Sequence, residues 1–320
     1  MFGLEYPVMS APMTLHCNAT LAGAVSAAGG LGSLPGWHPT NGPEWVRREI
    51  AAVRAATDAP FAVGFITNLI GFAEPLFEAA LAEHPPLMAL SFGDPSPWIA
   101  RCKAAGVQVM CQVQTYADAD RAVSAGADLL VAQGNEAGGH TGTMGLLSFL
   151  TGVVARHPDI PVLAAGGIGD GATLAAALIA GADGAWMGTA FLATTESTEI
   201  DDVHKQYIVE SDGGDTVFTR AYDILTGMPW PNGVGERVRR NRFTDEWAER
   251  EAELQEHKSE VTERRSAEHL GGQEDPDVRE ILYGQSARCV DEIRTVADVL
   301  HSVCGDAASQ LRLRSDALLS

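Results

Sequence analysis

The first 195 residues alternate short apolar runs with longer segments of helical pattern, which predicts a repeated strand–helix unit. Several of the runs are apolar without interruption, as expected for parallel strands that are covered on both faces. The predicted strands are residues 7–11, 30–34, 61–65, 87–92, 107–113, 128–132, 161–165 and 184–187. Helical patterns separate them, for example at residues 20–28, 45–56, 117–125 and 172–180.

Eight strand–helix units within 195 residues predict an α/β fold, namely a TIM-type (β/α)8 barrel. The alternative is a doubly wound open sheet, in which a glycine-rich dinucleotide fingerprint follows the first strand. Ala11, Pro12 and Met13 occupy that place in this chain. The barrel is therefore the prediction.

The composition changes near residue 196. Residues 1–195 carry 15 acidic and 7 basic side chains, whereas residues 196–320 carry 27 and 15. Helical patterns continue at residues 200–211, 244–270 and 286–303. We predict a barrel domain at residues 1–195 and a mainly helical substrate or lid domain at residues 196–284. A C-terminal helix at about residues 285–305 is expected to pack back on the barrel.

Two features of the second region bear on its role. Its longest helical pattern has a narrow apolar stripe, Trp247, Leu254, Val261 and Leu270, which is typical of a helix lying on a surface. Residues 228–233, Met-Pro-Trp-Pro-Asn-Gly, cannot be helical. Trp230 in this segment either covers a pocket or fills a gap in the packing, and the gap is the favoured interpretation. The region as a whole is expected to be a lid or the surface of a homodimer.

Charge and cysteine usage exclude several function classes. With 22 Lys+Arg against 42 Asp+Glu, the net charge of −20 disfavours binding to nucleic acids and to anionic membranes. No apolar run approaches the ~20 residues that cross a bilayer, and residues 1–5 lack the start of a signal peptide. The five cysteines are scattered along the chain, which indicates reduced thiols and not a disulfide framework. A cytoplasmic protein is therefore expected. No spacing typical of a metal site is present, and none is predicted.

Two glycine-rich segments follow the last two predicted strands. Gly166 and Gly167 follow the seventh strand, and Met187, Gly188 and Thr189 follow the eighth. In a barrel these loops form the rim where phosphate groups commonly bind, because glycines let backbone N–H groups approach an anion closely. The alternative is that the glycines serve only as turns. Two such loops on adjacent strands favour a phosphate site.

The loop after the sixth strand, residues 133–142, places one imidazole among glycines. His140 follows Gly138 and Gly139 in a segment expected to be flexible and to face the rim. Histidine is the side chain suited to take or give a proton near neutral pH. His140 is therefore the candidate catalytic residue. The alternative is a loop histidine that only bonds to the backbone.

These segments resemble the nitronate monooxygenase family, formerly called 2-nitropropane dioxygenases. The resemblance covers most of the chain, and its most specific motif is the loop at residues 133–140. The other similar segments are residues 11–13, 24–32, 64–68, 164–168, 187–191, 226–229 and 241–243.

The resemblance implies a flavin mononucleotide (FMN) cofactor and assigns roles to individual residues. His140 matches the catalytic base of the family, and the phosphate would lie at Gly167, Gly188 and Thr189. Gln112 stands where some relatives carry a lysine, and a neutral amide would stabilise a reduced flavin anion less. The residues expected to contact FMN are Ala11, Pro12, Met13, Asn68, Gln112, Gln133, Gly138, Gly139, Gly166, Gly167, Met187, Gly188 and Thr189.

The reaction implied by the resemblance is the oxidative denitrification of alkyl nitronates, with O2, to carbonyl compounds and nitrite. For a neutral nitroalkane, His140 would first remove the proton α to the nitro group. An alternative on the same barrel is an FMN-dependent reductase that uses NAD(P)H to reduce quinones or enoyl thioesters. A third alternative is a flavin-binding protein without catalysis, against which the intact His140 loop argues.

Overall fold

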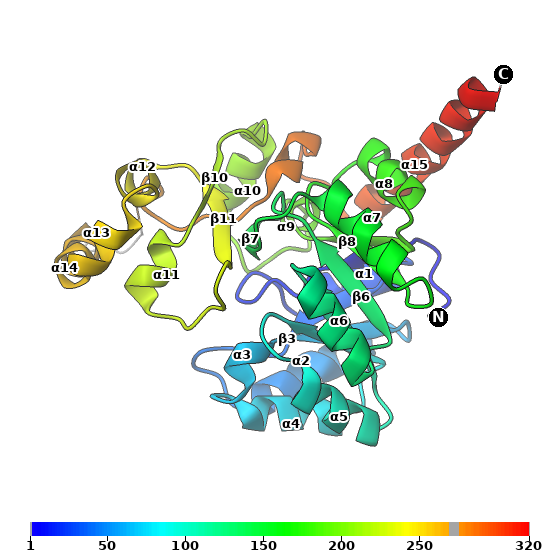
Figure 1. Ribbon diagram of the computed structural model, residues 1–320, viewed down its shortest axis with the longest axis horizontal. Coiled ribbons are helices and arrows are strands. Elements are labelled where there is room, and N and C mark those ends of the chain that lie inside the picture. Colours follow the sequence, from blue (N-terminus) through cyan, green and yellow to red (C-terminus); the bar gives the residue numbers. More distant parts are fainter. Residues whose placement is uncertain (1, 269–274, 320) are drawn as a thin grey trace.

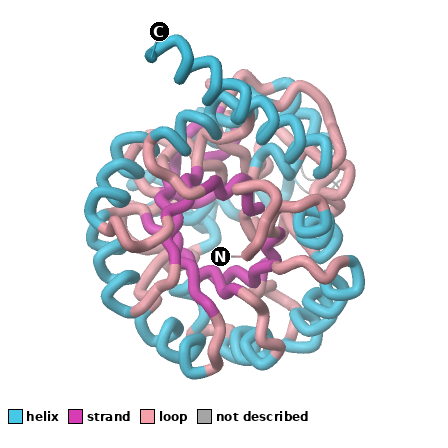
Figure 2. Tube along the Cα trace, turned by 90° about the vertical axis from the view of Figure 1, so that its right-hand side faces the viewer, coloured by secondary structure: helices cyan, strands magenta, loops and turns pink. Residues whose placement is uncertain are grey.

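The computed structural model describes residues 2–268 and 275–319. Its centre is a ring of eight strands surrounded by helices (Figures 1 and 2). All neighbouring strands in the ring pair in parallel, in the order β1-β9-β8-β6-β5-β4-β3-β2. The strands are β1 (Val8–Ser10), β2 (Gly32–Pro35), β3 (Phe61–Ile66), β4 (Leu87–Ser91), β5 (Gln108–Val113), β6 (Leu129–Gln133), β8 (Val162–Ala165) and β9 (Gly184–Met187).

Backbone hydrogen bonds close the ring between its first and last members. The Leu31 N–H donates to Val8 at 3.0 Å, and the Ser10 N–H donates to the Leu31 carbonyl at 3.0 Å. The predicted (β/α)8 barrel is thus confirmed, with all eight predicted strands in place. The helices around it are α1 (Ala19–Ala27), α2 (Pro43–Ala56), α3 (Thr67–Ile70), α4 (Glu74–Ala82), α5 (Ser96–Ala104), α6 (Tyr116–Ala125), α7 (Leu146–Arg156), α8 (Gly171–Ile179) and α9 (Thr189–Leu192).

Two apolar layers follow from the alternation of side chains along each strand. One set points inward and fills the barrel, including Met9, Met110 and Trp186. The other set packs against the surrounding helices, as Val63 and Leu130 do. Because both faces of every strand are covered, the strands read as continuous apolar runs in the sequence.

The region after the barrel has a hydrophobic core of its own. Tyr222, Phe243 and Trp247 are buried together, away from the barrel layers. Four helices of the region project to one side of the barrel (Figure 1), namely α11 (Ala221–Thr226), α12 (Arg242–Trp247), α13 (Glu251–Glu256) and α14 (Lys258–Glu268). The helix before them, α10 (Asp202–Glu210), packs on the barrel, and its Ile208 is buried in the outer apolar layer of the barrel. A separate core supports the predicted second domain, whose limits at 196 and 284 stay a prediction.

The predicted helix at residues 244–270 differs in the structure, where α12, α13 and α14 share this stretch. The helices are separated near Arg250 and His257, and Trp247, Leu254 and Val261 are all buried in the core of the second region. Leu270, the last member of the predicted stripe, lies outside the described residues.

The second region also holds strands that the helical pattern did not predict. β10 (Thr216–Thr219) and β11 (Gly235–Arg239) join β7 (Gly139–Thr141) in a three-stranded antiparallel sheet, ordered β10-β11-β7. Because β7 belongs to the barrel's sixth loop, this sheet fastens the second region to the rim of the barrel.

The C-terminal segment lies against the barrel, and its helix begins later than residue 285. Residues 285–289 form a 3-10 turn (η1, Gln285–Cys289), and α15 (Val296–Leu319) follows. Between them, Arg294 pairs with the backbone near Thr194, which keeps this stretch extended. α15 packs on α8 and α1, and its far end projects from the barrel (Figure 1).

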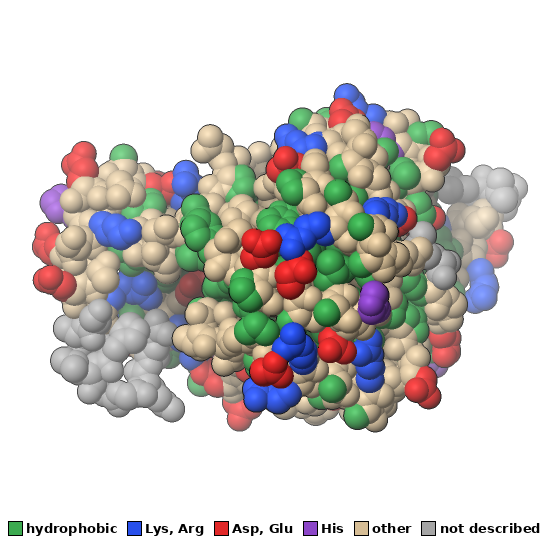
Figure 3. Space-filling model, turned by 90° about the horizontal axis from the view of Figure 1, so that it is seen from below, with side chains coloured by type: hydrophobic (Ala, Val, Ile, Leu, Met, Phe, Trp, Pro, Cys, Tyr) green, Lys and Arg blue, Asp and Glu red, His purple; other side chains and the backbone are tan. Residues whose placement is uncertain are grey.

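The surface carries charges of both signs. On the face shown in Figure 3, acidic and basic side chains are interspersed. Within the described ranges, no helix is both long enough and apolar enough to cross a membrane.

Candidate active site

A cavity of about 210 Å³ opens at the carboxyl ends of the barrel strands. In barrels of this kind the chemistry takes place at this end. His140 lines the cavity, as do all the residues predicted to contact FMN except Asn68. These are Ala11, Pro12, Met13, Gln112, Gln133, Gly138, Gly139, Gly166, Gly167, Met187, Gly188 and Thr189.

Asn68 lies in α3 beside the cavity, and its side chain contacts the segment at residues 228–233. Its Nδ2 donates to the Pro229 carbonyl at 2.7 Å, and its Oδ1 is buried without a hydrogen-bond partner among the described residues. Asn68 thereby joins the loop after β3 to residues 228–233. Its contact with a cofactor stays a prediction.

The loop at residues 133–142 is held firmly, whereas the sequence predicted a flexible segment. Gln133 Nε2 donates to the backbone carbonyl of His140 at 3.0 Å, and Gln114 Nε2 donates to Gln133 Oε1 at 2.9 Å. Residues 139–141 form β7 and pair with β11. Since its backbone is fixed by this pairing, His140 presents its ring from a strand.

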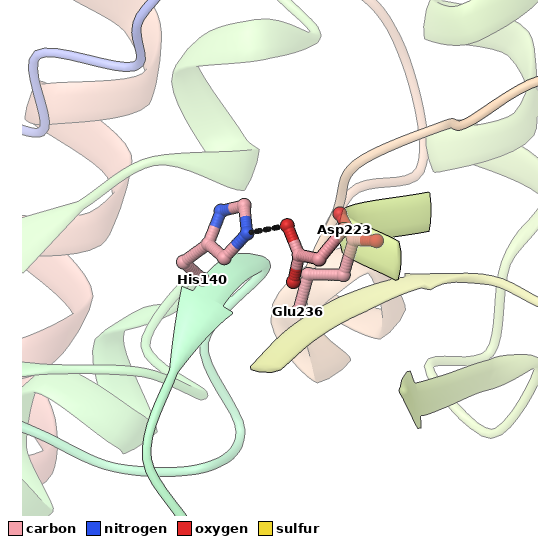
Figure 4. A group of neighbouring side chains, drawn as sticks. All are labelled: His140, Asp223 and Glu236. Carbon is pink, nitrogen blue, oxygen red and sulfur yellow. Dashed lines mark hydrogen bonds and ion pairs between the residues drawn. The ribbon is translucent and has the colours of Figure 1, made fainter. Parts of the chain in front are cut away.

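Asp223, 83 residues away in the sequence, holds the His140 ring. The distance from His140 Nε2 to Asp223 Oδ1 is 2.8 Å, and the two side chains are 16% and 8% exposed (Figure 4). A carboxylate can only accept, so Nε2 carries the proton of this hydrogen bond. Nδ1 is then the nitrogen of the neutral ring that has a lone pair.

Glu236 completes a buried acid–base cluster with His140 and Asp223. It lies opposite His140 in the pairing of β7 with β11 and is fully buried. One donor or acceptor atom from each of the three side chains lies within 4.8 Å of the other two. Burial raises the pKa of the Glu236 carboxyl well above its usual range, and Glu280 and Asp223 raise it further.

Two aromatic side chains cover His140. The rings of Trp230 and His140 are stacked, with centroids 3.6 Å apart and planes 18° apart. Phe92 meets Trp230 edge to face at 5.2 Å, and all three residues line the cavity. The expectation that Trp230 fills a gap was therefore wrong, since it covers the pocket.

Phe92 adopts a left-handed backbone with a φ of 63°, which is uncommon for a bulky residue. Such a conformation persists only where its surroundings enforce it, and it recurs at functional sites. Here it turns the chain directly after β4, so that the ring lies beside Trp230. No pattern in the sequence predicts a φ of this kind.

Titratable groups in the cavity are few. Among the described lining residues, only His16 and His140 are side chains that ordinarily change charge near neutral pH. His16 Nδ1 bonds to the Thr14 carbonyl at 3.0 Å, and its ring meets His204 edge to face. Cys111 is buried behind the strands, and burial raises its pKa to about 12, so its thiol is not a nucleophile at neutral pH.

Comparison with known proteins identifies the family. The model of a family described as nitronate monooxygenase matches residues 1–78 and 76–306. The chain belongs to the nitronate monooxygenase family. A nitronate monooxygenase of Paraburkholderia phytofirmans is 34% identical over 267 residues, which cover 69% of this chain and 72% of that protein.

Two solved structures share the fold across almost the whole chain. FabK from Thermotoga maritima superposes with a TM-score of 0.85 and 31% sequence identity. The match covers 98% of this chain and 96% of the FabK chain. A nitroalkane oxidase from Streptomyces ansochromogenes gives a TM-score of 0.80 and 29% identity, covering 98% of both chains. The chain is thus an enzyme of a flavin-dependent oxidoreductase family.

The cavity residues of this family member suit a flavin. The loop after β8 bends sharply at Gly166 and Gly167, with φ of 103° and 70°, which side chains disfavour. Thr189 begins α9, and the first N–H groups of a helix have no partner within it. Backbone N–H groups therefore lie where the sequence predicts that a phosphate binds. Met13 and Trp186 form part of the apolar wall of the cavity. Gln112 lines the cavity with a neutral side chain.

Proposed function

We propose that the chain is an FMN-dependent nitronate monooxygenase that, with O2, converts alkyl nitronates, and neutral nitroalkanes once their α-proton is removed, to carbonyl compounds and nitrite. The observation that carries the proposal is the His140–Asp223 pair at 2.8 Å on the wall of the rim cavity. A histidine paired with a carboxylate is the arrangement that abstracts a proton from carbon near neutral pH. A nitroalkane is activated by such a step.

FMN would lie with its phosphate against the backbone of Gly167, Gly188 and Thr189. Its ring system would lie near Ala11–Met13, with Gln133 as a polar neighbour. When bound, the flavin supplies one-electron chemistry that no side chain offers. The protein supplies position, exclusion of water and the base.

The chain's own residues perform three tasks in this reaction. His140 accepts the α-proton of a neutral nitroalkane at Nδ1, because Nε2 is engaged with Asp223. The Asp223 carboxylate stabilises the imidazolium that forms. Trp230 and Phe92 exclude water above the ring and so strengthen both interactions. A preformed nitronate bypasses the first task, since it has already lost its proton.

The test of the proposal is an aerobic assay of the purified protein loaded with FMN. An alkyl nitronate is supplied without nicotinamide, and nitrite and oxygen are followed together. We expect nitrite release with oxygen uptake. Without nitrite release, the monooxygenase proposal fails, and oxidation of NAD(P)H with a quinone or an enoyl thioester would indicate the reductase alternative. Chromatography of the released flavin distinguishes FMN from other flavins.

Replacing Asp223 with asparagine is expected to slow turnover of a neutral nitroalkane by roughly 10- to 100-fold. The amide keeps an oxygen that can accept the Nε2 proton, but the negative charge that stabilises the imidazolium is lost. Turnover of the preformed nitronate should change little. Steady-state rates with both substrates measure this difference, and an equal loss with both would show that Asp223 only supports the fold.

A further inference from the structure

Glu236 is a buried carboxyl group that the proposed mechanism does not use. It is fully buried in β11, and neither of its oxygens has a hydrogen-bond donor within reach in the described part of the chain. Asp223 Oδ2 is likewise buried and without a donor. Several unsatisfied carboxylate oxygens in one place are costly, because a buried acceptor that leaves water loses its hydrogen bonds.

One proton on Glu236 removes this cost. A carboxylic acid donates one hydrogen bond, whereas a carboxylate only accepts. Two acceptors face Glu236, namely Asp223, whose carboxylate lies within 4.8 Å, and Glu280, whose negative charge raises the pKa of Glu236. A hydrogen bond between two carboxyl groups requires a proton on one of them. Glu280 is only half-buried, so the fully buried Glu236 is the less costly place for that proton.

The charges around Glu236 agree with this assignment. Among the described residues, the groups that face it are Asp223 from α11, His140 from β7, Arg265 from α14, and Glu280 from the stretch before η1. Among these described groups, three carboxyl groups are accompanied by one cationic side chain and one imidazole. Coupled carboxyl groups at this spacing do not all ionise together, because each negative charge disfavours the next.

We propose that Glu236 is a positioning residue, held as a neutral carboxylic acid, that donates a hydrogen bond within the acid cluster and leaves Asp223 as the single negative charge facing His140. A second ionised carboxyl group beside the ring would favour the imidazolium form, which cannot accept a proton. A neutral donor behind Asp223 also fixes the orientation of its carboxylate. Both effects keep His140 ready to act as a base. The proposal rests on the proposed function only for the identity of the substrate.

The test compares two replacements at this position. Glu236→Gln keeps the shape and provides two N–H donors without charge, so it should retain nitroalkane turnover within about twofold. Glu236→Leu removes the donor and leaves Asp223 Oδ2 unsatisfied, so nitroalkane turnover should fall roughly tenfold or more. Turnover of the preformed nitronate should change little in both variants. Glu256→Gln, an exposed site in α13, is the matched control.

A second readout needs neither flavin nor substrate. Infrared spectra of the wild-type protein at neutral pH should contain the carbonyl stretch of a protonated carboxylic acid, and Glu236→Gln should remove it. If the band is absent in the wild type, or persists in Glu236→Gln, the proposal is wrong. It is also wrong if Glu236→Gln loses nitroalkane turnover as severely as Glu236→Leu.

The two proposals can fail separately. If the wild-type protein releases no nitrite from a nitronate, the proposed function fails, and the infrared band alone decides the state of Glu236. If Glu236→Leu does not fold, the infrared band and the activity of Glu236→Gln still decide. A Glu236→Gln variant that folds, lacks the band and keeps its activity supports the proposal.

Discussion

Replacing His140 with asparagine is expected to lower turnover of a neutral nitroalkane by ~10²–10⁴-fold, the usual contribution of a general base. Asparagine can still bond to Asp223, but its amide cannot take a proton from carbon. Turnover of the preformed nitronate should remain within a small factor of the wild type, because that substrate has already lost its α-proton. The measurement is the ratio of the two rates at saturating flavin.

Two controls separate this effect from general damage. Flavin affinity should be nearly unchanged, because the phosphate would lie in other loops, at Gly167, Gly188 and Thr189. His301→Asn, at an exposed position of α15, should leave both rates unchanged. If His140→Asn turns over a neutral nitroalkane at the wild-type rate, His140 is not the base and the role of its pair with Asp223 must be reconsidered.

The barrel could be predicted from the sequence because each of its strands is covered on both faces. A run such as residues 129–132 is apolar throughout, so the strand can be recognised from the sequence, and the helical patterns between such runs can be recognised in the same way. The second region lacks this regularity. β10 and β11 are short, and β11 has charged residues at three of its five positions, Glu236, Arg237 and Arg239. The partner of β11 on its other side, β7, lies in a loop that is far away in the sequence. Pairing over such a distance leaves no local pattern.

The same distinction explains which parts of the site could be predicted. The rim residues follow the strands directly, so locating the strands also locates residues such as Gln133, Gly167 and Gly188 at one end of the barrel. Asp223 and Glu236 reach His140 from the second region and have no spacing that marks them. Only the tertiary fold brings them together. Phe92 was missed because its role depends on an unusual φ.

Replacing Gly138 with alanine is expected to weaken flavin binding on the order of 100-fold and to destabilise the protein by about 1–3 kcal/mol. An added Cβ would lie 2.4 Å from the backbone carbonyl carbon of Tyr283 and 2.4 Å from the backbone nitrogen of Gly284. Neither backbone atom can swing aside as the end of a flexible side chain can. The segment at residues 282–284 would have to move, although it forms part of the cavity wall and the Gly284 N–H donates to Thr189 Oγ1 at 2.9 Å.

Position 284 likewise has no room for a side chain, since a Cβ on Gly284 would lie 2.6 Å from the backbone nitrogen of Gly138. The two glycines therefore allow direct backbone contact between the loop that carries His140 and the segment at residues 282–284 of the cavity wall. Flavin titration and denaturant unfolding of the apoprotein measure the two expected effects. Gly71→Ala is the control, because a Cβ there meets nothing within 4 Å and the backbone is helical. Equal behaviour of Gly138→Ala and Gly71→Ala in both measurements would show that residues 282–284 yield without cost and do not shape the flavin site.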